Sequence, residues 1–191
     1  MLRSSACAGT MLRASRFCRS LAALRRDRRG VASIEFALCA GFLSVAVLNA
    51  ADVSIYLFQR MQVETATEMG AQAAWKTCDV NSLPATTNCA GLTAAVTRAV
   101  QGTTLGSRIT LQTGSPSEGY YCVNSSNTLQ FMNDVSTAKP ADCSAAGTPG
   151  NQPGDYVWIR TTFTYAPLFP GITIANAFAG PITRTAMMRL G

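Results

Sequence analysis

The chain has 191 residues, room for one modest domain after an N-terminal segment. Its net charge of +6 is unevenly placed, because residues 1–30 carry a net +7 and the remaining 161 residues a net −1. The basic character therefore belongs to the N-terminal segment, and we expect no nucleic-acid partner. The absence of histidine excludes a histidine general base, a histidine-containing triad and a histidine-ligated metal.

A junction follows the basic segment, in the sequence Arg-Arg-Asp-Arg-Arg-Gly-Val-Ala-Ser-Ile-Glu-Phe. Dense charge stops at Gly30, and residues 31–58 are mostly apolar, with Glu35 and Asp52 as the only charged residues. The uncharged stretch 36–51 spans about 24 Å as a helix, and its flanks extend it to the ~30 Å of a bilayer core. Because cationic residues lie on one side only, we predict a single-pass helix with a cytoplasmic N-terminus and an exported C-terminal part.

The two acids in this segment need separate explanations. A carboxylate at mid-bilayer costs about 2.5 kcal/mol or more, so Glu35 is functionally interesting. From the residue alone, two interpretations are equally open: contact with the cytoplasmic headgroups, or pairing during helix assembly. We interpret Asp52 as a boundary charge at the periplasmic surface. A secretory signal peptide fits less well, because cleavage after Ala50 or Ala51 would put Leu48 or Asn49 where a small residue is preferred.

The helix is predicted to continue beyond the membrane, to about Trp75. Residues 59–77 lack proline and are rich in helix-forming residues. Phe58, Met61, Met69 and Ala73 recur at three- to four-residue steps, if Thr65 is allowed between them. We predict that this stripe packs on a globular body.

Four cysteines follow on the exported side, which predicts two disulfides. They are Cys78, Cys89, Cys122 and Cys143. Three pairings are possible, and we favour Cys78–Cys89 with Cys122–Cys143 because each closes a local loop rich in turn formers. A four-thiolate zinc site would require pairs two to four residues apart, which the sequence lacks, so we expect no metal. Cys7 and Cys18 precede the helix and should stay reduced.

Periodicity predicts a small α+β body with an antiparallel sheet. A short helix is expected over 90–101, a brief one over 172–178, and a loop over 136–155. Strands are expected over 108–112, 119–123, 129–132, 156–165 and 182–190. The domain organisation is then a basic leader (1–30), a transmembrane helix (31–58) and an exported domain (59–191). That domain comprises a helix extension (59–77) and a disulfide-containing body (78–191).

No set of residues indicates catalysis. Asp134, Asp142 and Asp155 are scattered through a loop region without metal-ligand spacing, and no glycine-rich phosphate loop follows a strand. We therefore expect a protein that is not an enzyme and that has no cofactor. A secreted enzyme would need an active site that the sequence does not contain.

The helical region resembles the TadE-like family, the minor pilin-like proteins of tight-adherence (Flp-type) pili. The resemblance rests on Arg-Arg-Gly-Val-Ala-Ser-Ile-Glu-Phe-Ala-Leu, on Asp52 seventeen residues after Glu35, and on the Ala-rich continuation from Gln62. The C-terminal pattern is also similar: an aromatic strand, Tyr-Ala-Pro-Leu, and then Ile-Thr-Arg-Thr-Ala-Met-Met-Arg. Residues 78–155 give no family-specific signal.

The resemblance implies a pilin-like fold and cleavage after Gly30 by a prepilin peptidase, an aspartyl membrane protease. Val31 would become the mature N-terminus, and its ammonium would pair with Glu35 of a neighbouring subunit. Implied partners are this peptidase, other pilin-like subunits, inner-membrane assembly proteins and the lipid bilayer. The implied location is the bacterial inner membrane, with possible incorporation into a pilus. The alternative is an uncleaved, signal-anchored periplasmic binding or scaffold module.

Overall fold

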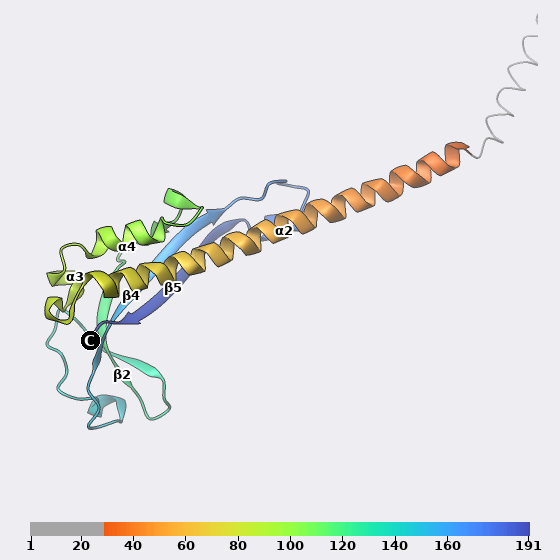
Figure 1. The fold of residues 1–191 in the computed structure, drawn as a ribbon. Coiled ribbons are helices and arrows are strands. Elements are labelled where there is room, and N and C mark those ends of the chain that lie inside the picture. Colours follow the sequence, from red (N-terminus) through yellow and green to blue (C-terminus); the bar gives the residue numbers. More distant parts are fainter. Residues whose placement is uncertain (1–28) are drawn as a thin grey trace, which may run out of the picture. The chain divides into compact units, whose positions relative to one another are not determined.

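The computed structural model describes residues 29–191, so the basic leader with Cys7 and Cys18 lies outside the described residues. The first described helix, α2, spans Arg29–Thr77 (Figure 1). Contacts divide the chain between Leu48 and Asn49, and residues 49–191 form one unit that we call the body. Short helices in the body are α3 (Ala85–Asn88), α4 (Leu92–Val100), η1 (Val80–Ser82), η2 (Gly106–Arg108), η3 (Ser144–Ala146) and η4 (Ile174–Phe178).

The body contains one antiparallel sheet of five strands. They are β1 (Thr110–Leu111), β2 (Ser117–Val123), β3 (Leu129–Asp134), β4 (Gly154–Tyr165) and β5 (Gly180–Arg189). Strand β4 is central: β1 and β2 share one of its edges, β5 lies along the other, and β3 pairs with β2. The predicted α+β class, a long N-terminal helix followed by an antiparallel sheet, is confirmed.

Alternation along β4 places its apolar residues on the face that carries the core. Val157, Ile159, Phe163 and Tyr165 are buried there, together with the polar Thr161. The Thr161 hydroxyl lies 2.6 Å from the hydroxyl of Thr67 on helix α2, so both buried polar groups have a partner. This hydrogen bond adds to the packing that holds the strand against the helix.

The predicted packing stripe on α2 is wrong. Phe58 and Met61 are 61% and 66% exposed, and Met69 is also exposed. The face of α2 that packs on the sheet and on α4 is built from smaller residues, among them a glycine at position 70. Its members are Val63, Ala66, Thr67, Gly70, Ala71 and Ala74.

Close approach explains why small residues occupy this face. A Cβ atom added at Gly70 would lie 2.8 Å from Val100 Cγ2 and 3.3 Å from Ile159 Cγ2. Both distances are shorter than ordinary van der Waals contact, so α2, α4 and β4 meet at this point through backbone and short side chains. Large side chains on this face would hold the helix away from the sheet.

Candidate functional site

The predicted processing and assembly residues lie at the start of α2. Gly30 and Val31 are in its first turn, and Glu35 follows one turn after Val31 on the same side of the helix. All three are exposed, and the Ser33 hydroxyl donates a hydrogen bond to the Gly30 carbonyl at 2.9 Å. Within residues 29–191, the side chain of Glu35 has neither a salt bridge nor a hydrogen bond.

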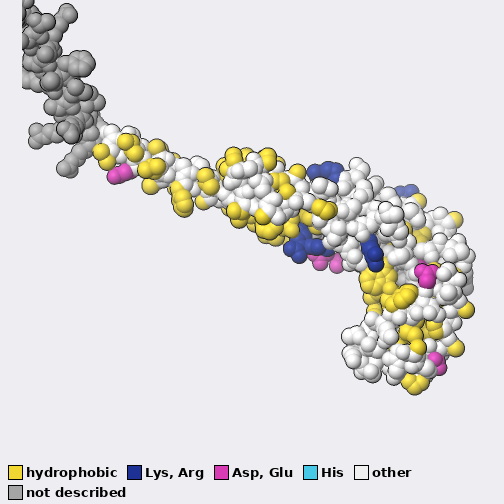
Figure 2. Space-filling model, turned by 180° about the vertical axis from the view of Figure 1, so that it is seen from behind, with side chains coloured by type: hydrophobic (Ala, Val, Ile, Leu, Met, Phe, Trp, Pro, Cys, Tyr) yellow, Lys and Arg dark blue, Asp and Glu magenta, His cyan; other side chains and the backbone are white. Residues whose placement is uncertain are grey.

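The helix around these residues presents an apolar surface. Figure 2 shows hydrophobic side chains along the described helix. One helix in residues 29–191, Gly30–Thr77, is long and apolar enough to cross a membrane, and none of its most apolar window is buried. The exposed large residues before the body are Val31, Ile34, Phe36, Leu38, Phe42, Leu43, Val45 and Val47. Such a surface supports a single-pass membrane anchor.

The sequence-based interpretation of Asp52 as a boundary charge at the surface is wrong. Asp52 is fully buried, not exposed at a boundary. Its carboxylate accepts hydrogen bonds from Leu168 N (2.9 Å), Phe169 N (3.3 Å) and the Thr173 hydroxyl (2.6 Å). These donors all belong to residues 166–179, which connect β4 to β5 and which we call the β4–β5 loop. Asp52 therefore fixes this loop to the helix.

Neighbouring contacts reinforce the same attachment. Ile174 N donates to Asn49 Oδ1 at 2.8 Å, and the Tyr165 hydroxyl donates to the Asp52 carbonyl at 3.2 Å. The ring of Tyr56 stacks on Phe178 with centroids 5.0 Å apart and meets Tyr165 edge-on at 5.1 Å. Polar and aromatic contacts together hold the β4–β5 loop against residues 49–56 of α2.

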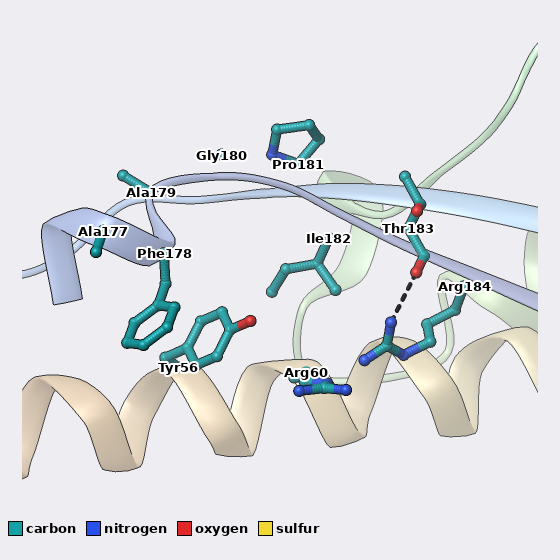
Figure 3. A pocket seen from close by; sticks show the side chains of 10 residues that line it. All are labelled: Tyr56, Arg60, Ala177, Phe178, Ala179, Gly180, Pro181, Ile182, Thr183 and Arg184. Carbon is teal, nitrogen blue, oxygen red and sulfur yellow. Dashed lines mark hydrogen bonds between the residues drawn. The ribbon is translucent and has the colours of Figure 1, made fainter.

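Figure 3 shows a groove beside this attachment, between α2 and the start of β5. Its volume is about 390 Å³. Arg60 and Arg184 line it, and Arg184 pairs with Glu64 at 3.7 Å while donating to the Thr183 carbonyl. The rest of its lining is Tyr56 and residues 177–183, so the two arginines are the charged side chains of this groove.

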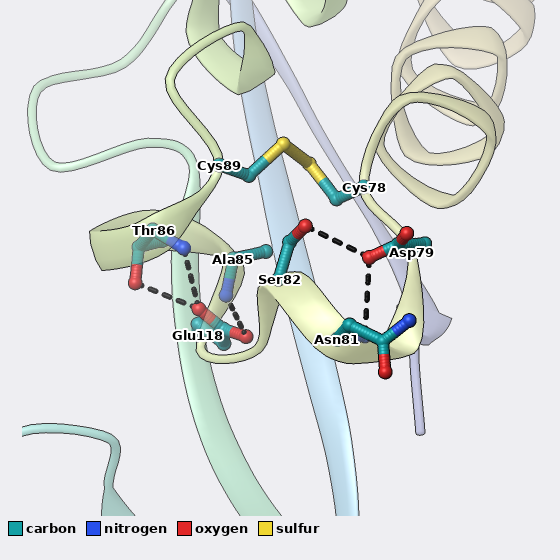
Figure 4. The surroundings of a disulfide bond; sticks show 8 residues. All are labelled: Cys78, Asp79, Asn81, Ser82, Ala85, Thr86, Cys89 and Glu118. Atoms are coloured by element: carbon teal, nitrogen blue, oxygen red, sulfur yellow. Dashed lines mark hydrogen bonds between the residues drawn. A yellow bond between two sulfur atoms is a disulfide. The ribbon is translucent and has the colours of Figure 1, made fainter.

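The structure joins the cysteines in the pairs that the sequence favours. Cys78–Cys89 has Cα atoms 5.8 Å apart, and Cys122–Cys143 has them 5.6 Å apart, both ordinary for disulfides. Cys39 is free and exposed on α2. Figure 4 shows the first bridge above a turn in which Asp79 accepts hydrogen bonds from Asn81 N and the Ser82 hydroxyl.

Glu118 on strand β2 is a second buried acid, and it lies at the start of helix α3. Glu118 accepts hydrogen bonds from Ala85 N, Thr86 N and the Thr86 hydroxyl, and so caps the start of α3. Asp155, also buried, lies on the neighbouring strand and faces the same side of the sheet. Burial, and then the adjacent Glu118 carboxylate, raise the pKa of Asp155 to about 7, although the Lys139 ammonium opposes this shift.

Metal binding has no candidate in the described chain: between residues 29 and 191, no three cysteine, aspartate or glutamate side chains are grouped to hold an ion. Asp52, Asp79 and Glu118 instead accept hydrogen bonds from protein groups, and the buried Asp155 lies beside Glu118.

Comparison with known families identifies the helical segment. The model of the family described as TadE-like protein matches residues 30–72, which include Gly30, Glu35 and Asp52. The resemblance seen in the sequence is thus confirmed for this segment. Comparisons with curated proteins and with solved structures found no match.

The contacts of Asp52 predict a specific effect of Asp52→Asn. The substitution removes the charge and one acceptor oxygen, so three donors compete for one oxygen. Hydrogen bonds to charged groups contribute about 1.5–3 kcal/mol. Hydrogen exchange at the Leu168 and Phe169 amides should accelerate about 10- to 100-fold, as measured by mass spectrometry on the full chain in detergent.

Asp79→Asn is the matched control, because Asp79 is exposed and caps only η1. It should leave exchange in the β4–β5 loop unchanged. Equal exchange in the wild type and Asp52→Asn would contradict the anchoring role.

The raised pKa of Asp155 predicts that stability depends on pH. The folded protein holds this proton more tightly than the unfolded chain, where the pKa is near 3.8. The free energy of unfolding should therefore fall as pH rises from about 4 to about 7, by about 1.4 kcal/mol per unit of pKa difference at most. Urea unfolding across this range should show the slope in the wild type and lose it in Asp155→Asn. The exposed Asp134→Asn should retain it, and a flat wild-type profile would refute the prediction.

Proposed function

We propose that this protein is a non-enzymatic, minor pilin-like component of a tight-adherence (Flp-type) pilus. Helix α2 anchors it in the bacterial inner membrane, with the N-terminus in the cytoplasm and the body in the periplasm. The observation that carries the proposal is the TadE-like segment, an exposed apolar helix with one carboxylate near its start. In water such a surface is unfavourable, but it is stable in lipid and against other apolar helices.

The packing of the body supports a crossing over residues 31–48, within the predicted 31–58. Asp52 is buried in the body, and Ile55 and Tyr56 pack against its core. The preceding 18 residues span about 27 Å as a helix, close to the ~30 Å of the hydrocarbon core. Helix α2 therefore supplies first the proposed membrane segment and then, from Asn49 to Thr77, the helix that packs in the body.

The start of α2 supports processing and assembly. Cleavage after Gly30 by a prepilin peptidase creates an ammonium on Val31. In an apolar helix bundle, this charge and a neighbouring subunit's Glu35 compensate each other, which an isolated carboxylate cannot achieve. The bond to be cut lies in the first helical turn, so the peptidase must open this turn. Glycine lowers helix stability by about 1 kcal/mol and makes the opening easier.

A second surface supports packing between subunits. Phe58, Met61 and Met69 lie on the side of α2 that the body leaves exposed. They form an exposed apolar stripe on the part of α2 that follows the membrane segment in the sequence. Neighbouring pilus subunits are the partners that such a stripe suits, because apolar helices bury it without losing hydrogen bonds.

Processing predicts a mature protein that begins at Val31. Mass spectrometry of membrane and pilus fractions should find this N-terminus in cells with an active prepilin peptidase. Gly30→Arg should abolish it, because a long side chain blocks approach to the scissile bond, and pili should be lost with it. Gly41→Ala is the control, since a Cβ there meets nothing within 4 Å. An intact N-terminus with normal function in Gly30→Arg would support the uncleaved scaffold module instead.

Assembly through Glu35 predicts a different phenotype for Glu35→Ala. Cleavage should remain normal, while the fraction of protein in sheared pili should fall about tenfold or more, because the Val31 ammonium loses its partner and 1.4 kcal/mol corresponds to a factor of ten. Quantitative immunoblots of pilus and membrane fractions measure this. Glu68→Ala, an exposed acid of the same helix, should assemble normally. Unchanged pili in Glu35→Ala would remove this role of Glu35.

A further inference from the structure

The β4–β5 loop carries an unusual concentration of exposed apolar side chains. Leu168 and Ile172 are each 60% exposed and Ile174 is 65% exposed, and Phe178 is also exposed. No residue from 166 to 183 is charged. Soluble proteins seldom expose several large apolar side chains in one short segment without a partner.

The attachment of this loop fixes its position along the helix. Its hydrogen bonds reach Asn49 and Asp52, within one turn of helix. Asn49 directly follows Leu48, the last residue of the proposed crossing. If the bilayer encloses the helix up to Leu48, its edge lies next to Asn49, the first residue of α2 that holds the loop.

Along α2, cationic side chains follow the apolar loop, and this order matches that of a membrane interface. Arg60 lies eight residues after Asp52, about 12 Å further along the helix axis. It lines the groove of Figure 3 together with Arg184. Passing from Leu48 into the body, the surface is first apolar, at the loop, and then cationic, at the groove. Hydrocarbon followed by phosphate has the same order.

We propose that the β4–β5 loop is a second membrane-contacting element, which inserts Leu168, Ile172 and Ile174 into the bilayer interface beside α2. The Leu168 and Phe169 amides already have an acceptor in Asp52, so these two groups can enter an apolar environment without leaving a hydrogen bond unmade. The body then contacts lipid through this loop. The inference rests on the proposed membrane crossing of α2.

Site-directed spin labelling tests this insertion in the full chain. Cys7, Cys18 and Cys39 are replaced by serine, and single labels are placed by Ile172→Cys, Leu43→Cys and Ser126→Cys. The protein is reconstituted into vesicles of phosphatidylcholine with a minority of phosphatidylglycerol. Power saturation then compares accessibility to oxygen, which partitions into lipid, with accessibility to a water-soluble nickel complex. Leu43 reports the membrane segment, and Ser126 reports the exposed β2–β3 turn.

The expected oxygen-to-nickel ratio at position 172 is several-fold above that at 126 and approaches that at 43. A ratio at 172 equal to that at 126, with 43 in lipid, overturns the insertion but leaves the membrane crossing intact. A watery signal at 43 overturns the crossing itself. If both reagents are excluded at 172, and access returns when the protein is diluted into excess lipid, a second copy covers the loop and the insertion is again wrong.

Discussion

The hydrogen bonds between Asp52 and the β4–β5 loop fix the point at which one continuous helix changes its surroundings. Before this point the side chains of α2 are exposed and apolar, and after it one face is covered by the sheet. A buried carboxylate is stable only with donors, and the amides of Leu168 and Phe169 would equally lack an acceptor without it. The helix and the loop therefore depend on each other. Because these contacts involve only Asn49 and Asp52, the surroundings of α2 change within about one helical turn.

After Asp52, the two faces of α2 differ in the size of their apolar side chains. The face toward the sheet has Gly70 and short side chains, so the backbone of α2 can lie directly against the side chains of Val100 and Ile159. The opposite face keeps Phe58 and Met61 exposed. Burial in the core therefore does not consume the largest apolar side chains of the helix. They remain available to other helices, as the proposed assembly through α2 requires.

The sequence predicted elements well where a pattern is local. The helix expected from about Val31 to Trp75 runs from Arg29 to Thr77, and the strand expected over 156–165 is β4, Gly154–Tyr165. The two disulfides join cysteines only 11 and 21 positions apart, and the turn-forming residues between them make these local pairings predictable from the sequence.

What the sequence failed to predict depends on contacts far along the chain. Helical periodicity allowed two faces of α2, and hydrophobicity favoured the face with larger side chains, whereas close packing selected the smaller ones. The environment of Asp52 depends on Leu168, 116 residues away. Nothing near Asp52 in the sequence signals a donor, so a surface position was the natural expectation for an acid at the end of an apolar run.

Membrane contact and assembly place a common demand on this surface. A subunit that leaves the bilayer for a fibre must exchange lipid for protein over its whole apolar surface, because exposure to water is unfavourable in proportion to area. If the β4–β5 loop contacts lipid in the monomer, the exchange includes Leu168, Ile172 and Ile174 as well as residues 31–48. The neighbour in a fibre must then cover the loop and the helix together. A partner that covered only the helix would leave the loop apolar and exposed, so the loop limits which neighbouring arrangements are stable.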